Sequence, residues 1–369
     1  MSVGAEPSYR AASKPAVRES FKFDPNDPLL LIPVRVGSKD YQFVLDTGAT
    51  VSMFDVSLRS HLGPRVDSTP VTSASGERVE LNLYSPPDAR VGSLPLTKDP
   101  VLCLELTPFR ESSGCSVCGL VGMDFLKNWI IAIDFDEGRL DVLSADTERD
   151  PKWGEGIPFV YDEKGLMFVL ATVGGNIRTP FAVDTGDAGT GDLEGGLLTR
   201  LVGAREARVT GDGKAMDLSG IQSLKVARLS HLSLGSFRHD NLRFISGKRN
   251  ALGLNYLSRY RLTINFPDKR LHLAKGKDFA YRDTGHTCGL NYLFKGGGLE
   301  VISVDEKSPA HAAGFRPKDV IVKLGGKRVS EWKPSRIRRL LGAEGKAVQV
   351  TVQRGGKRLE MNFTPKEYD

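Results

Sequence analysis

Short apolar runs, interrupted every few residues by Gly, Pro, Asn or Asp, make up most of the chain. Residues 29–34, 129–135 and 260–266 are examples, and each is about as long as one β-strand. Runs of this length bounded by turn-forming residues are typical of strands. The pattern therefore predicts a mainly β protein, and its 369 residues are enough for two or three domains with separate cores.

Part of this pattern occurs twice. Residues 43–48 read Phe-Val-Leu-Asp-Thr-Gly, and residues 181–186 read Phe-Ala-Val-Asp-Thr-Gly. Downstream, residues 120–126 (Leu-Val-Gly-Met-Asp-Phe-Leu) are matched by residues 251–257 (Ala-Leu-Gly-Leu-Asn-Tyr-Leu), and each is followed by a strand-like run. Matching blocks in the same order indicate an internal duplication, with room for one small β domain per copy.

The duplicated motifs resemble those of the aspartic proteases, specifically two retropepsin-like lobes joined in one chain, over roughly residues 28–275. In that family each lobe supplies one Asp-Thr-Gly loop, and a later apolar-apolar-Gly segment packs behind it. The resemblance implies Asp46 and Asp184 as catalytic residues. It implies supporting roles for Thr47, Gly48, Thr185, Gly186, Gly122 and Gly253.

Two adjacent carboxyls suit peptide hydrolysis because two negative charges at contact distance cannot both persist. As in the known aspartic-protease dyads, such a pair shares one proton and titrates as a unit. The ionised member of Asp46 and Asp184 would activate water, and the protonated member would polarise the scissile carbonyl. Gly48 and Gly186 permit close backbone approach, and this chemistry calls for no metal and no cofactor.

The second loop departs from the family pattern at Asp187, where a small or hydroxylated residue is usual. A third carboxylate there would either raise the affinity of the dyad for protons or turn outward, and we expect it to turn outward because a Gly-rich run follows. A third Asp-Thr-Gly, residues 283–285, has no apolar strand leading into it, so we interpret it as a coincidental loop.

Residues 71–81 read as two strands around a Ser-Gly turn, at the position of the flap that closes over bound peptide in the family. Ser75 and Gly76 would form its tip, where glycine allows the mobility that a lid requires. An ordinary surface hairpin is the alternative. Residues 209–213 are a weaker flap candidate in lobe 2.

The character of the sequence changes from about residue 278. Residues 298–304, 308–315 and 318–329 closely resemble a bacterial-type PDZ domain, a family that binds an extended peptide at a sheet edge and holds its terminal carboxylate with loop amides. The resemblance assigns the carboxylate loop to Cys288, Gly289 and Leu290, the receiving strand to residues 291–293, and the other groove wall to a helix near 335–341. Arginines of that helix would either favour acidic ligands or lie on a solvated face.

Composition narrows the function further. The net charge of +6 is modest and spread along the chain, so no concentrated basic face suggests nucleic-acid binding. No run approaches the roughly 18 apolar residues of a membrane span. Residues 1–20 contain no apolar core of a secretory leader. We expect a cell-envelope or secreted protein if a leader was removed, and otherwise a cytoplasmic one.

The four cysteines leave three interpretations open. Cys115 and Cys118 have a CxxC spacing, which fits plain thiols, a local disulfide or, least well, a metal site completed by Cys103 and a distant His. His231 and His239 lie beside strand-like residues without a nucleophile signature, so we expect structural or surface roles for both.

These observations predict a mainly β fold with two acid-protease-type β-barrel lobes in tandem and a small α/β PDZ domain. The expected function is an aspartic endopeptidase, acting as a monomer on polypeptide substrate, whose PDZ domain binds a peptide or protein C-terminus. A catalytically silent peptide-binding adaptor on the same scaffold is the alternative. The expected divisions are a polar arm (1–27), lobe 1 (28–146), a linker (147–155), lobe 2 (156–275) and the PDZ domain (276–369).

Overall fold

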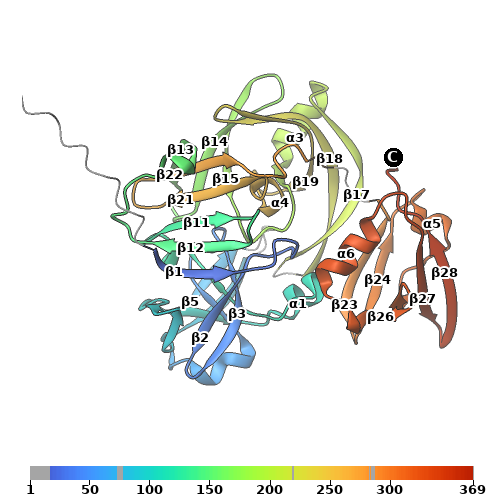
Figure 1. The fold of residues 1–369 in the computed structure, drawn as a ribbon, viewed down its shortest axis with the longest axis horizontal. Helices are drawn as coiled ribbons and strands as arrows, with labels where there is room; N and C mark the ends of the chain where they lie inside the picture. The colour runs from blue at the N-terminus through green and yellow to red at the C-terminus, as the bar shows by residue number, and fades with distance from the viewer. Residues whose placement is uncertain (1–16, 73–77, 218–219, 282, 284–286, 369) are drawn as a thin grey trace, which may run out of the picture.

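The computed structural model describes residues 17–72, 78–217, 220–281, 283 and 287–368. It confirms the predicted fold class, because the chain is mainly β with barrel-like lobes and a PDZ domain. Within the described residues the strands form three sheets, and the PDZ domain stands to one side of the two lobes (Figure 1). One large hydrophobic core spans both lobes, lobe 1 has a second, smaller cluster, and the PDZ domain has a core of its own.

Lobe 1 is built on a sheet with the order β5-β6-β9-β4-β10-β3-β2-β7-β8. In this sheet β3 lies between β2, which is antiparallel to it, and β10, which is parallel. The end of β3 is buried on both faces because Phe43 and Leu45 pack into one hydrophobic cluster and Val44 into another. This sheet consists of β2 (Leu31–Val36), β3 (Lys39–Leu45), β4 (Met53–Asp55), β5 (Arg65–Thr72), β6 (Arg78–Tyr84), β7 (Ala89–Val91), β8 (Leu94–Pro95), β9 (Val101–Leu104) and β10 (Val117–Val121).

A second sheet joins the two lobes through the strand order β1-β12-β11-β21-β22-β13. These strands are β1 (Val17–Lys22), β11 (Ile130–Asp134), β12 (Arg139–Leu143), β13 (Glu155–Tyr161), β21 (Tyr260–Asn265) and β22 (Arg270–Lys275). The two strand-like runs of the duplication therefore pair with each other, with Ile130 opposite Asn265. Residues 17–22, assigned to the arm in the sequence analysis, form β1 against β12.

The same sheet continues into lobe 2 as β14-β15-β20-β16-β19-β18-β17. Its strands are β14 (Met167–Val173), β15 (Ile177–Val183), β16 (Gly191–Glu194), β17 (Ala207–Asp217), β18 (Gly220–Leu234), β19 (Phe237–Gly247) and β20 (Ala251–Leu252). β15 is parallel to β20 as β3 is to β10, so the end of each aspartate-bearing strand has the same kind of neighbour.

Helices are short throughout the lobes. They are η1 (Val56–His61), α1 (Thr107–Ser113), α2 (Met123–Leu126), η2 (Pro151–Trp153), α3 (Gly195–Gly203) and α4 (Leu254–Leu257). Within the described residues no helix is both long and apolar enough to cross a membrane.

The PDZ domain contains β23 (Leu290–Lys295), β24 (Gly298–Val304), α5 (Pro309–Ala312), β25 (Val320–Leu324), β26 (Lys327–Arg328), η3 (Val329–Glu331), α6 (Pro334–Gly342), β27 (Val348–Arg354) and β28 (Lys357–Phe363). β23 is an edge strand, because the sheet order is β23-β24-β25-β27-β28. The amphipathic sequence of α6 explains its packing, since Ile337 and Leu341 are buried while Arg336 is exposed.

Candidate active site

The two Asp-Thr-Gly loops lie against each other where β3 and β15 end. The backbone N–H of Thr47 donates to Oγ1 of Thr185 at 3.0 Å, and the N–H of Thr185 donates to Oγ1 of Thr47 at the same distance. Each hydroxyl also donates to the opposite strand end, Thr47 to the carbonyl of Val183 at 2.6 Å and Thr185 to that of Leu45 at 2.7 Å. This buried reciprocal network fixes the two loops relative to each other.

The glycines of the motif bring the two carboxyls close together. A Cβ atom placed on Gly48 would overlap the carboxylate of Asp184, and one placed on Gly186 would lie 2.5 Å from Cγ of Asp46. Each carboxylate also accepts from its own loop, Oδ1 of Asp46 from the N–H of Gly48 at 2.7 Å and Oδ1 of Asp184 from that of Gly186 at 3.1 Å. A side chain at either glycine would displace the opposing aspartate.

The apolar-apolar-Gly segments pack directly behind these loops. Asp46 N–H donates to the carbonyl of Val121, and Asp184 N–H donates to that of Leu252, both at 3.0 Å. A Cβ on Gly122 would lie 2.7 Å from the backbone of Val51. Gly253 has equally little room, since a Cβ there would overlap the carbonyl of Gly189.

A second supporting contact behind each loop was missed by the sequence analysis. In lobe 1, Ser52 Oγ donates to Asp124 Oδ1 at 2.8 Å and accepts from Gly122 N–H at 3.1 Å. In lobe 2, Asn255 Nδ2 donates to Oγ1 of Thr190 at 3.0 Å. The signal was available, because Asp124 and Asn255 occupy the same position of the repeated segment.

The two aspartates have different electrostatic surroundings. Burial, followed by the charge of Asp184, raises the pKa of Asp46 to about 8, although the amide of Gly48 opposes the shift. Asp184 instead forms an ion pair, with its Oδ2 atom 2.8 Å from Nη2 of Arg249. A guanidinium at this distance stabilises the charged carboxylate. The sequence analysis did not identify Arg249. Its only sequence signal is its position just before the repeated segment at 251–257.

The expected outward orientation of Asp187 is wrong. Its Oδ1 accepts from the N–H of Gly189 at 2.8 Å, and its Oδ2 is buried without a hydrogen-bond partner in the described part of the chain. The Gly-rich run lets the chain fold back over the carboxylate, and the absence of a side chain at Gly253 leaves space for it. Burial and then the charge of Asp184 raise the pKa of Asp187 to about 6.

A fourth carboxyl, Asp192 on β16, completes the cluster. Burial, then the charges of Asp187 and Asp184, raise its pKa to about 8, and Arg249 acts in the opposite direction. In the part of the chain that the structure describes, Asp46, Asp184, Asp187 and Asp192 therefore all lie within the electrostatic influence of one cation, Arg249.

This cluster predicts a pH-dependent effect of Asp192→Asn. Because the pKa of Asp192 is raised in the folded chain, folding favours its neutral form, and stability is lost as the pH rises through about 8. An amide keeps the shape without the charge. The melting temperature of Asp192→Asn should exceed that of the wild type by a few degrees at pH 9 and by less at pH 5. The exposed carboxylate of Asp146 supplies the control, since Asp146→Asn should show no such trend; an equal pH trend in both variants would contradict the prediction.

The predicted flap tip, Ser75 and Gly76, lies outside the described residues. The strands on either side of it, β5 and β6, pair antiparallel up to Thr72 and Arg78. Residues 209–213 lie within β17, paired with β18, and not in a turn, so this second flap candidate is not a hairpin tip.

Of the third Asp-Thr-Gly, the structure describes Asp283. Asp283 Oδ2 accepts from Oγ1 of Thr190 at 2.6 Å and from the N–H of Arg243 at 3.0 Å. Asp283 therefore attaches the segment that precedes β23 to lobe 2.

The cysteines and histidines have no place in the dyad. All four cysteines are free thiols, and the described residues hold no cluster of His, Cys, Asp and Glu suited to a metal ion. His239 is buried with Nε2 2.6 Å from the hydroxyl of Tyr260, and burial lowers the pKa of His239 to about 4. His231 lies 3.3 Å from the hydroxyl of Ser230, through its Nδ1.

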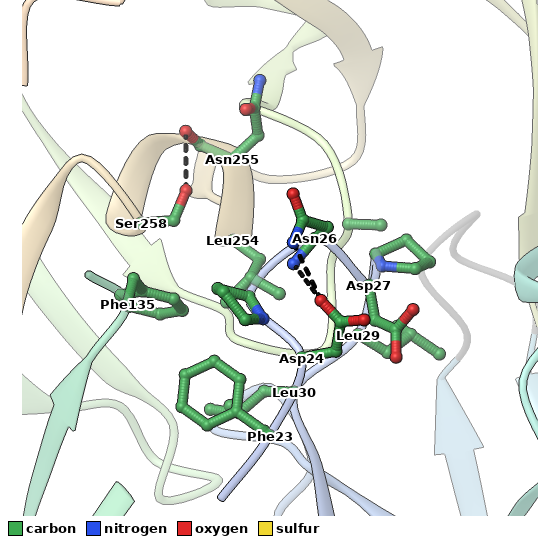
Figure 2. Close-up of a pocket in the computed structure, with 13 residues that line it drawn as sticks. Phe23, Asp24, Asn26, Asp27, Leu29, Leu30, Phe135, Leu254, Asn255 and Ser258 are labelled. Atoms are coloured by element: carbon green, nitrogen blue, oxygen red, sulfur yellow. Dashed lines mark hydrogen bonds between the residues drawn. The ribbon is translucent and has the colours of Figure 1, made fainter. Parts of the chain in front are cut away.

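A cavity of about 210 Å³ borders the second loop (Figure 2). It is lined by residues 23–30 together with Phe135, Ala188, Leu254, Asn255 and Ser258. Neither aspartate of the dyad lines it, so this cavity is not the expected peptide cleft.

In the PDZ domain, Gly289 has a φ of 77°, a left-handed conformation that favours glycine, and its carbonyl accepts from the N–H of Asp305 at 2.9 Å. Leu290 begins the edge strand β23, and Cys288 is buried beneath it. The hydroxyl of Tyr368, close to the chain end, donates to Oδ2 of Asp305 at 2.6 Å. The tail therefore runs back beside the predicted carboxylate loop.

Comparison with known protein families agrees with this arrangement. A family described as aspartyl protease matches residues 32–125, and a family described as PDZ domain matches residues 271–364. The chain therefore combines an aspartyl-protease domain with a C-terminal PDZ domain, a type of module that binds peptides.

A curated protein from Staphylococcus saprophyticus, named "Probable CtpA-like serine protease", is 34% identical over 64 residues. That match covers 17% of this chain and 13% of the relative's length. Because so little of either chain is aligned, the serine mechanism in its name belongs to that protein.

Proposed function

We propose that this protein is an aspartic endopeptidase whose catalytic dyad is Asp46 and Asp184. The observation that carries the proposal is the reciprocal pair of hydrogen bonds between Thr47 and Thr185. It holds the two loops so that each motif glycine faces the carboxylate of the other lobe. Two carboxyls confined in this way form a unit that can share one proton.

The unequal surroundings of the two aspartates suggest separate roles. Asp184, paired with Arg249, is the ionised member and accepts a proton from water as the oxygen attacks the scissile carbonyl carbon. Asp46, whose pKa is raised to about 8, is the protonated member and donates to the carbonyl oxygen. The resulting gem-diol collapses when the peptide nitrogen takes the proton now held by Asp184, one hydroxyl returns its proton to Asp46, and the C–N bond breaks.

This division of roles sets the working pH. The active form has one proton on the dyad, and Asp46 keeps that proton until the pH approaches about 8. Cleavage should therefore persist at neutral pH and decline above about pH 8 as Asp46 ionises.

The remaining parts of the proposal concern organisation. We keep the divisions predicted from the sequence for lobe 1, lobe 2 and the PDZ domain, and we propose that polypeptide binds between the lobes and a C-terminal peptide binds to the PDZ domain. Both aspartates come from one chain, so a monomer would suffice for catalysis.

A catalytically silent peptide-binding module is the second candidate. Two observations favour it. Arg249 forms an ion pair with Oδ2 of Asp184, and Asp187 places an extra buried carboxylate beside the dyad. Both features are unhelpful to a dyad that must bind water and substrate.

A library of long peptides, incubated with the wild type and with Asp184→Asn from pH 4 to pH 9, separates the two candidates. The endopeptidase should cut internal bonds, and Asp184→Asn should abolish every cut while keeping the wild-type melting temperature. Cutting that survives in the variant would remove Asp184 from the mechanism. A folded wild type that cuts nothing at any pH would favour the silent module.

A further inference from the structure

The PDZ resemblance assigns the peptide groove to two walls, the edge strand β23 and the helix α6. In the structure, α1 of lobe 1 packs against β23. Figure 1 shows α1 beside β23 and α6, at the boundary between the lobes and the PDZ domain. Residues more than 150 positions apart in the sequence are thus in direct contact.

Arg338 of α6 makes the central polar contact of this boundary. Its Nη2 atom donates to the carbonyl of Ser113 at 2.6 Å and to that of Ser112 at 3.1 Å. These carbonyls belong to the last turn of α1, where unpaired oxygens and the helix dipole favour a cation. Arg338 therefore caps the C-terminus of a helix that belongs to another domain.

Phe294, near the end of β23, makes the apolar contact. A Cβ placed on Gly114, the C-cap of α1, would lie 2.9 Å from the ring of Phe294. The guanidinium of Arg338 also lies over this ring, 5.2 Å from its centre. The end of α1 therefore contacts both Phe294 of β23 and Arg338 of α6.

We propose that α1 holds this groove closed, and that an extended peptide with a free C-terminal carboxylate competes with α1 for it. We infer the class of ligand, a peptide, from the PDZ domain, and we infer the competition from the contacts that α1 makes with β23 and α6. The proposal does not depend on catalysis by the dyad.

The closed state leaves polar groups that a peptide could satisfy. In the described residues β23 has a single ladder partner, β24, and a helix cannot supply the second. An added strand would pair with this edge. In addition, Nη1 of Arg338 is buried without a partner among those residues, which costs stability. Both features lower the free energy needed to exchange α1 for a peptide strand.

The PDZ domain would stay attached to lobe 2 while α1 leaves. Near the chain end, Glu367 lies 3.6 Å from Arg228 on β18, and before β23 the carboxylate of Asp283 accepts from the N–H of Arg243 on β19. α1 also packs against β17 of lobe 2, so its release would change the surroundings of the β17–β18 hairpin. The proposed competition therefore links the groove to both lobes.

Arg338→Ala in the full chain tests this proposal, with Arg336→Ala as the matched control because Arg336 is an exposed arginine of the same helix. Loss of the cap should increase hydrogen exchange of the α1 and β23 amides about tenfold, because exchange reports local opening. It should also raise the affinity for a pool of random peptides with free C-terminal carboxylates by about tenfold. Arg336→Ala should match the wild type in both measurements.

Two further measurements and a second variant complete the experiment. The same peptide pool with amidated C-termini should bind neither variant, and the bound carboxylate pool should increase exchange of α1 in the wild type. If Arg338→Ala does not fold, Phe294→Ala opens the groove from its other wall and should give the same changes. The proposal is overturned if exchange of α1 is the same in the opened and control variants, or if bound peptide leaves α1 protected.

Discussion

Asp46→Asn should lower the rate of peptide cleavage at pH 7 by about a hundred- to ten-thousand-fold, the usual contribution of a positioned acid or base. Asn resembles a protonated aspartate in shape but cannot give up and regain the proton. Because Asp46 is buried and its carboxylate accepts from the N–H of Gly48, the amide oxygen can keep that contact. The fold should survive, and the loss should appear in kcat.

The matched control is Asp146→Asn, the same substitution at an exposed aspartate. Asp146 lies outside the carboxyl cluster described above, so this variant should cut peptides at nearly the wild-type rate once folding is verified. Initial rates on one library-derived peptide, with melting curves of all three proteins, are sufficient. Cleavage by Asp46→Asn at the wild-type rate would show that Asp46 is not a member of a catalytic dyad.

The sequence could predict the general architecture because its signals are local and repeated. The mainly β fold follows from strand-length apolar runs, and the meeting of the two Asp-Thr-Gly loops follows from their duplicated surroundings. The hydrogen bonds between Thr47 and Thr185 lie where that duplication places them. The catalytic role of Asp46 and Asp184 stays a prediction.

Other parts of the site depend on contacts that no local pattern encodes. Arg249 reaches Asp184 across 65 positions, and arginine before a strand is usually a surface residue. The direction of Asp187 depends on space left by Gly253, which belongs to another segment. The packing of α1 against β23 joins two domains, and the sequence motif of one domain does not predict where the other domain packs.

The second large effect is expected for Arg249→Gln, because Arg249 is the single cation placed against the four carboxyls of the cluster in the described residues. Its charge stabilises ionised Asp184 and lowers the pKa of Asp46, Asp187 and Asp192. Without it, the neutral form of each carboxyl becomes more favourable. The whole pH profile of kcat/KM should move to higher pH, by about 1 to 3 units, the range typical of a lost opposite charge.

Both limbs of the profile should move for the same physical reason. On the acid side, the variant lacks the ion pair that favours the ionised carboxylate needed as a base, so cleavage near pH 5 should fall most. On the alkaline side, Asp46 would hold its proton beyond pH 8, so cleavage near pH 9 should be retained better than in the wild type. Arg249→Lys keeps a positive charge and should move the profile much less. If Arg249 merely blocked the dyad, its removal would raise kcat/KM at every pH without moving either limb. The shape of the pH profile therefore distinguishes an electrostatic partner of Asp184 from a residue that blocks Asp184.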